Sequence, residues 1–134
     1  MAMGMCLLSA RAASIADKLG VDLAIVHKER KVANQVSRMI LVGNVADKVA
    51  ILVDDIADAC GTLALASSIL REQGAKQSTV IVAHGFLSGP IADVVENSHL
   101  DALVVANTLP FKIKQFDVSA TIAEAIRRTH NGES

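Results

Sequence analysis

The sequence has few aromatic residues, prolines and cysteines, and its charges nearly cancel. Among 134 residues there are three phenylalanines, no tryptophan or tyrosine, two prolines and two cysteines. Thirteen Lys and Arg oppose 14 Asp and Glu, which gives a formal net charge of −1. Nucleic-acid-binding surfaces are normally basic, and single-strand binders stack bases on aromatic side chains. Both absences argue against a nucleic-acid partner.

Targeting segments and a disulfide framework are not expected either. Cys6 and Cys60 show no C-x-x-C pattern, which favours free thiols in a reducing compartment. Residues 1–10 are apolar, but the first charge, Arg11, follows this run, whereas a signal peptide has its basic residues first. No apolar stretch approaches the roughly 20 residues of a membrane span. The sequence therefore predicts a soluble, cytoplasmic protein with no membrane segment.

Aliphatic residues are abundant, and they follow an alternating pattern. Hydrophobic residues make up 51% of the chain, which excludes disorder and suffices for the core of one domain spanning residues 1–134. Short apolar runs predict strands at 21–27, 38–43, 48–53, 78–83 and 102–106. Helical spacing predicts helices at 9–19, 61–73, 90–97 and 119–128. This alternation predicts an α/β fold, a doubly wound parallel sheet with flanking helices.

Smaller features complete this picture. The charged stretch 28–38 predicts a loop. Thr121 and Glu124 have the spacing of a capping box, which is expected at the start of the last helix. In parallel sheets, ligands bind at the carboxyl ends of the strands. Candidate ligand-binding residues are therefore expected after four strand ends, at Val26, Val53, Ala83 and Ala106.

One segment, residues 48–62, contains residue types that suit a ligand-binding site. An apolar strand runs into Asp54 and Asp55, and after a short loop Gly61 and Thr62 open a helix. The N-terminus of a helix offers free N–H groups to a phosphate. Two carboxylates beside it can hold the vicinal hydroxyls of a ribose, or a hydrated Mg²⁺. The alternative is that both aspartates merely cap the helix, and local spacing leaves the two interpretations open.

The same segment resembles the phosphoribosyl pyrophosphate (PRPP) loop of PRPP synthetases and phosphoribosyltransferases. The segments VDLAIVHKERK, MILVGNV, VAILVDDIADACGT, AHGFLSGP, VVANTLP and AEAIRRTHNGES are similar, in this order, to the C-terminal half of eukaryotic PRPP synthetases. The resemblance covers residues 14–134, whereas 1–13 diverge. It implies a type I phosphoribosyltransferase-like fold. It also implies ribose-phosphate diphosphokinase activity, which moves the pyrophosphoryl group of ATP to C1 of ribose 5-phosphate with Mg²⁺ and yields PRPP and AMP.

The resemblance assigns catalysis to the HKERK segment, a mobile loop in the family. Lys28 and Arg30 are the expected catalytic residues. Arg30 can bond two oxygens of the transferring group, while Lys28 acts as a point charge. Taken alone, this segment favours a solvated charged loop instead.

Substrate binding is also assigned by resemblance. Asp54 and Asp55 are expected to hold the ribose hydroxyls and the associated metal. The cradle of the 5-phosphate is expected at five consecutive residues, Asp58, Ala59, Cys60, Gly61 and Thr62. Ala59 stands where the family usually has threonine, so we expect weaker sugar-phosphate binding. Cys60 has no base partner nearby in the sequence and is not expected to be a nucleophile.

Three further polar residues lie near predicted strand ends. His84 could touch a ligand or metal, although a histidine at a strand end is more often structural. Asn107 and Thr108 fall in a stretch that lines nucleotide and subunit contacts in the family. Residues 88–90 most simply start a helix.

The family's ATP site comes largely from an N-terminal half, and nothing in this chain resembles that half. The expected partners are ATP and ribose 5-phosphate, together with further copies of the chain or full-length synthetase subunits. A regulatory or associated subunit without catalysis is the main alternative. A phosphoribosyltransferase is disfavoured, because the match extends far beyond the PRPP loop. Uncovered apolar surface also predicts self-association.

Overall fold

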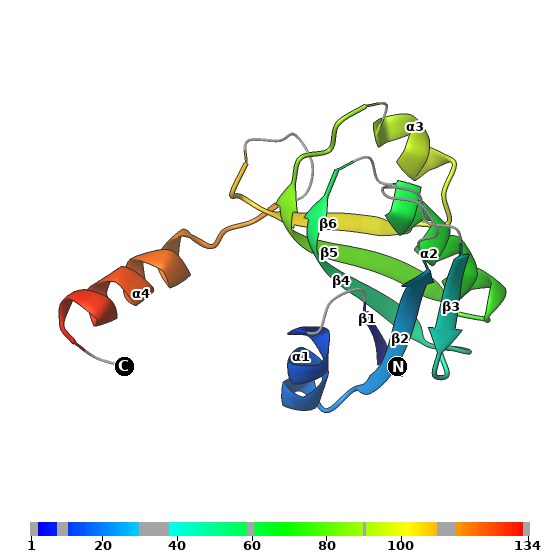
Figure 1. Ribbon diagram of the computed structural model, residues 1–134, viewed down its shortest axis with the longest axis horizontal. Coiled ribbons are helices and arrows are strands. Elements are labelled where there is room, and N and C mark those ends of the chain that lie inside the picture. Colours follow the sequence, from blue (N-terminus) through cyan, green and yellow to red (C-terminus); the bar gives the residue numbers. More distant parts are fainter. Residues whose placement is uncertain are drawn as a thin grey trace.

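A computed structural model describes residues 3–7, 11–29, 38–58, 61–89, 91–109 and 115–132 (Figure 1). The first half of the chain forms β1 (Met3–Leu7), α1 (Arg11–Leu19), β2 (Asp22–Glu29), β3 (Arg38–Val42), β4 (Val49–Ala57) and α2 (Gly61–Glu72). The second half forms β5 (Gln77–Gly85), α3 (Ile91–Glu96), β6 (Ala102–Ala106), β7 (Gln115–Phe116) and α4 (Ser119–His130).

The strands form one sheet in the order β3-β2-β1-β4-β5-β6-β7. Every neighbouring pair is parallel except β2 and β3, which are antiparallel. The predicted doubly wound parallel sheet is confirmed, and the edge strand β3 adds one antiparallel pair that was not predicted. Residues 30–37 alone connect the two strands, fewer than the dozen or so that a parallel crossover needs.

The core lies between the sheet and the helices on its two faces. On one face, the buried side chains of the central strands pack against α2: Leu52, Val80, Val82, Leu63, Ala66 and Leu70. On the other face, Ala12 and Ala16 of α1 are fully buried against Val53. This two-sided covering explains why β4 and β5 read as nearly continuous apolar runs.

Several strand limits differ from the sequence prediction. β1 was not predicted, and neither was the two-residue β7. β4 continues past Val53 to Ala57, and β2 continues to Glu29. Lys28 therefore lies in a strand, paired with Met39, and not in the predicted loop. Most of the expected loop, residues 30–37, lies outside the described residues.

The four helix predictions are confirmed to within two residues at each end. Gly20 and Gly74 end α1 and α2 with φ of 63° and 88°, a conformation that glycine adopts without strain. The prediction of a capping box at Thr121 and Glu124 is wrong, because the N-cap residue of α4 is Val118 and no side chain caps the helix there. Glu124 instead accepts hydrogen bonds from Arg127 at 2.8 Å. None of the described helices is long and apolar enough to span a membrane.

Candidate functional site

The sheet changes its direction of winding between β1 and β4. From β1 the chain adds β2 and β3 on one side, and β4 to β7 on the other. Ligand sites in open α/β sheets form at such a reversal, outside the carboxyl ends of the strands. β4 carries Asp54 and Asp55 toward this end and leads through Asp58 into the connection with α2. The aspartates predicted from the sequence thus lie where the topology favours a ligand.

Asp54 and Asp55 belong to β4 and not to the start of a helix. Asp54 Oδ1 accepts a hydrogen bond from the Asp55 N–H at 3.0 Å, and Asp55 Oδ1 accepts one from the Ile56 N–H at 2.9 Å. Asp54 is half-buried and Asp55 is exposed. Neither aspartate therefore occupies the N-cap position of α2, which begins at Gly61. Both carboxylates are held close to the backbone at the edge of the sheet.

The N-terminus of α2 is accessible at its first residue. Gly61 is exposed, and no described atom lies within 4 Å of where its Cβ would be. The first turn of α2 contains no acidic residue that could compete for its N–H groups. Thr62 is half-buried in the same turn. Free N–H groups and the helix dipole make this end suitable for an anion.

Hydrogen bonds join the connection after β5 to the end of β4 and the connection that follows it. The Ser88 hydroxyl donates a hydrogen bond to Asp58 Oδ1. The Ala57 carbonyl accepts from the Phe86 and Leu87 N–H groups at 2.8 and 3.1 Å. Sequence reasoning missed Ser88, which it placed at a helix start. The only available signal was its position shortly after a predicted strand.

His84 is fixed by a hydrogen-bond relay at the end of β5. Its Nδ1 lies 3.0 Å from Thr108 Oγ1, and the Thr108 hydroxyl donates to the Ala83 carbonyl at 2.9 Å. His84 pairs with Ile56 in the sheet, so it lies beside the strand that carries the aspartates. The structure therefore brings His84 and Thr108 together at the same edge as the candidate site.

Asn107 forms hydrogen bonds with the segment that leads into α4. Its side chain donates to Asp117 Oδ1 at 2.8 Å and accepts from the Val118 N–H at 3.0 Å. Hydrogen bonds from Ser119 and then Asn107 hold the pKa of Asp117 below its ordinary value. This contact was not predicted from the sequence.

The remaining expected site residues divide into two groups. The backbone of Lys28 lies near the end of β2, whereas Arg30, Ala59 and Cys60 lie outside the described residues.

Within the described ranges, no group of three or more His, Cys, Asp or Glu side chains could hold a metal ion. The oxygen ligands of Asp54 and Asp55 fit Mg²⁺ bound by one or two carboxylates and substrate phosphates. They do not form a cage made entirely of protein ligands.

Two curated yeast proteins are similar in sequence to this chain. Ribose-phosphate pyrophosphokinase 2 of Schizosaccharomyces pombe is 52% identical, over 92% of this chain and 41% of its own length. Ribose-phosphate pyrophosphokinase 3 of Saccharomyces cerevisiae is 54% identical with the same coverage. The chain thus spans about two fifths of the length of these curated relatives.

Solved structures confirm the fold class. Phosphoribosylpyrophosphate synthetase from Mycobacterium smegmatis superposes with a TM-score of 0.80 at 33% identity, over 97% of this chain and 45% of that one. Orotate phosphoribosyltransferase from Aeropyrum pernix superposes with a TM-score of 0.59 at 19% identity, over 94% of this chain and 66% of that one. The second likeness concerns the type I fold alone. The phosphoribosyl synthetase-associated domain family matches residues 30–134, so the chain belongs to this family and is homologous to part of ribose-phosphate pyrophosphokinase.

Proposed function

We propose that this chain binds ribose 5-phosphate and contributes to a ribose-phosphate diphosphokinase reaction, the synthesis of PRPP from ATP for nucleotide biosynthesis. One observation carries the proposal. Strand β4, which carries Asp54 and Asp55 near its carboxyl end and is followed by the exposed start of α2, lies where the sheet reverses its winding. The identity to yeast ribose-phosphate pyrophosphokinases supports this substrate in particular.

In this proposal the sugar phosphate spans β4 and α2. The ribose hydroxyls donate hydrogen bonds to the carboxylates of Asp54 and Asp55. The N–H groups of the first turn of α2, from Gly61 and Thr62 onward, donate to the 5-phosphate. Asp58, held by Ser88, keeps the connections after β4 and β5 together around the phosphate. Ala59 and Cys60 complete the same connection.

The proposed transfer moves the β,γ-pyrophosphoryl group of ATP. The hydroxyl oxygen on C1 of ribose 5-phosphate attacks the β-phosphorus and loses its proton to water, while the bond between the β-phosphorus and the α-phosphate oxygen breaks and AMP leaves. Lys28 and Arg30 are the cations proposed to stabilise the charge on the transferring oxygens. Asp54 and Asp55 would hold Mg²⁺, which would supply positive charge to the substrate phosphates.

A second candidate is a non-catalytic subunit that binds ribose 5-phosphate or a full-length synthetase. The match of residues 30–134 to the phosphoribosyl synthetase-associated domain family supports this candidate. Both candidates require the same sugar-phosphate site, and they differ in turnover.

A phosphorus NMR time course with ATP, ribose 5-phosphate and Mg²⁺ separates these candidates. PRPP and AMP resonances that grow together would establish catalysis by this chain. A ribose 5-phosphate resonance that shifts without turnover would support the binding subunit. A ribose 5-phosphate resonance that stays unchanged at saturating protein would contradict both.

Asp54→Asn tests the site itself. We expect a loss of ribose 5-phosphate affinity of about tenfold or more, because hydrogen bonds to a charged carboxylate contribute roughly 1.5–3 kcal/mol. Asp47→Asn is the matched control, since Asp47 precedes the amino end of β4 and its side chain is 87% exposed. Equal affinity losses in the two variants would place the binding site elsewhere.

A further inference from the structure

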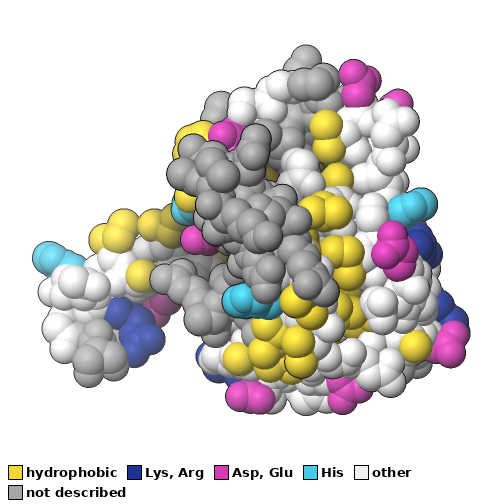
Figure 2. All heavy atoms as spheres, turned by 45° about the vertical axis from the view of Figure 1, so that its right-hand side comes forward, with side chains coloured by type: hydrophobic (Ala, Val, Ile, Leu, Met, Phe, Trp, Pro, Cys, Tyr) yellow, Lys and Arg dark blue, Asp and Glu magenta, His cyan; other side chains and the backbone are white. Residues whose placement is uncertain are grey.

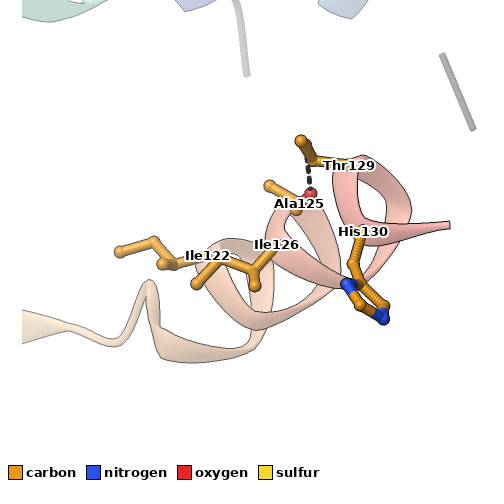
Figure 3. Close-up of a pocket in the computed structure, with 5 residues that line it drawn as sticks. All are labelled: Ile122, Ala125, Ile126, Thr129 and His130. Atoms are coloured by element: carbon orange, nitrogen blue, oxygen red, sulfur yellow. Dashed lines mark hydrogen bonds between the residues drawn. The ribbon is translucent and has the colours of Figure 1, made fainter. Parts of the chain in front are cut away.

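His84 is the histidine whose ring is held in place by another side chain. The chain has four histidines, and Figure 2 shows histidine side chains at separate places on the surface. His99 is exposed before β6, and His130 lines a pocket on α4 (Figure 3). Among the hydrogen bonds between described residues, only the one from His84 Nδ1 to Thr108 Oγ1, at 3.0 Å, involves a histidine ring. A ring fixed in this way presents its other nitrogen in one direction.

The other ring nitrogen of His84, Nε2, is available to a ligand. The Thr108 hydroxyl donates its single proton to the Ala83 carbonyl at 2.9 Å, so its oxygen can only accept from His84. In the neutral ring the proton is therefore on Nδ1, and Nε2 is an acceptor. No hydrogen bond between described residues reaches Nε2, and the side chain is exposed. Such an acceptor suits a ligand hydroxyl.

His84 lies on the same face of the sheet as Asp54. In the parallel register of β4 and β5, His84 is the partner of Ile56, and Val82 is the partner of Asp54. Side chains two residues apart in a strand point to the same face, so His84 lies on the face of Asp54 and Val82. Val82 belongs to the core that includes residues of α2. His84, Asp54 and the helix that follows β4 are therefore on one side of the sheet.

The separation of Asp54 and His84 suits a pentose. Two residues along a strand span about 6.6 Å and neighbouring strands are about 4.8 Å apart, so the two Cα atoms are diagonal neighbours at about 8 Å. A sugar ring above this face can contact both side chains at once. When Asp54 and Asp55 accept from the C2 and C3 hydroxyls of ribose, the hydroxyl on C1 is the one left without an acceptor from β4.

We propose that His84 Nε2 accepts a hydrogen bond from the hydroxyl on C1 of bound ribose 5-phosphate. This assignment rests on the proposed function and adds a contact from β5 to those from β4 and α2. The hydrogen bond orients the oxygen that attacks ATP, and Thr108 keeps Nε2 as the acceptor. The ligand class is a pentose phosphate with a free hydroxyl on C1.

Nitrogen NMR of the unmodified chain tests this contact directly. The chain, with isotopically labelled histidine, is titrated at alkaline pH with ribose 5-phosphate or with 1,4-anhydroribitol 5-phosphate, which lacks only the hydroxyl on C1. We expect ribose 5-phosphate to move the His84 Nε2 resonance to lower chemical shift, because this nitrogen accepts a hydrogen bond, and the analogue to leave it in place. Equal movement with both compounds, or none with saturating ribose 5-phosphate, would overturn the proposal.

His84→Asn tests the same contact through affinity. The asparagine amide can still donate to Thr108, but it does not reach the position of Nε2. By titration calorimetry, ribose 5-phosphate should bind about threefold to tenfold more weakly, the range expected for one neutral hydrogen bond, whereas the affinity for the analogue should not change. His99→Asn is the matched control, because His99 is exposed before the amino end of β6, at the opposite end of the strands.

The outcomes separate this contact from the function on which it rests. If the unmodified chain binds neither compound, the proposed function and the contact both fail. If the unmodified chain binds ribose 5-phosphate and His84→Asn binds it equally well, only the contact fails. The contact also fails if His84→Asn weakens both compounds to the same extent, because the lost interaction then does not involve the hydroxyl on C1.

Discussion

At the scale of single residues, hydrogen-bond partners decide what a side chain can offer a ligand. Thr108 has one hydroxyl proton, which it donates to the Ala83 carbonyl. Its oxygen can therefore only accept from His84 Nδ1, 3.0 Å away. This arrangement requires the proton of neutral His84 to be on Nδ1, and it leaves Nε2 as an acceptor.

Thr108→Val should change the tautomer of His84. Valine keeps the shape of the side chain but removes the acceptor for the Nδ1 proton. We expect nitrogen NMR at alkaline pH to report Nδ1–H in the unmodified chain and mainly Nε2–H in the variant. Thr108→Ser, which retains the hydroxyl, should behave as the unmodified chain does. An Nε2–H tautomer before any substitution would contradict this hydrogen-bond assignment.

The candidate site was predictable from sequence where its residues are adjacent in the chain. Asp54, Asp55 and Gly61 were identified because an apolar strand, two carboxylates and a helix start follow each other directly. Ser88 was missed because its bond to Asp58 spans 30 residues and depends on the pairing of β4 with β5. Roles for Lys28 and Arg30 came only from the family resemblance.

At the scale of elements, the end of β6 controls how α4 begins. Asp117 accepts hydrogen bonds from the Ser119 N–H and the Asn107 side chain, each at 2.8 Å. These bonds favour the carboxylate and lower the pKa of Asp117 from 3.8. Its contribution to stability is complete above the unfolded pKa and is lost as the pH falls through the lower, folded value.

An acid titration followed by NMR tests this link. The Ser119 amide resonance should move with a midpoint below 3.8, because it donates directly to Asp117 Oδ1. Asp117→Asn keeps an accepting oxygen but removes the titration, so this movement should disappear while α4 remains in place. A midpoint at or above 3.8 would show that the hydrogen bonds are not retained in solution.

Element prediction failed where pairing, rather than local pattern, creates the strand. Lys28 joins β2 because it pairs with Met39 of an antiparallel neighbour, although its charged surroundings favour a loop. The two residues Gln115 and Phe116 form β7 only by lying against β6. Glu124 fits a capping box by spacing, yet it pairs with Arg127 because the helix begins after Val118.

At the scale of the whole molecule, helices α1 and α2 pack on the two faces of the sheet, whereas α4 buries no residue. Helices α2 and α4 have the same length, 12 residues, but α2 buries four of them and α4 buries none. Local stability follows the burial of apolar contacts, so the two helices should open with very different free energies. We expect the sheet and α2 to unfold together. We expect α4 to open at a much lower free energy, because none of its residues is buried.

Amide hydrogen exchange measures this difference directly. In the Ile126→Glu variant we expect α4 amides to exchange within about tenfold of an unstructured peptide, since isolated helices of this length are marginal. Amides of β4, β5 and α2 should remain protected to near the global free energy of unfolding, because their contacts form the core. Protection of α4 equal to that of α2 would mean that α4 packs within its own molecule.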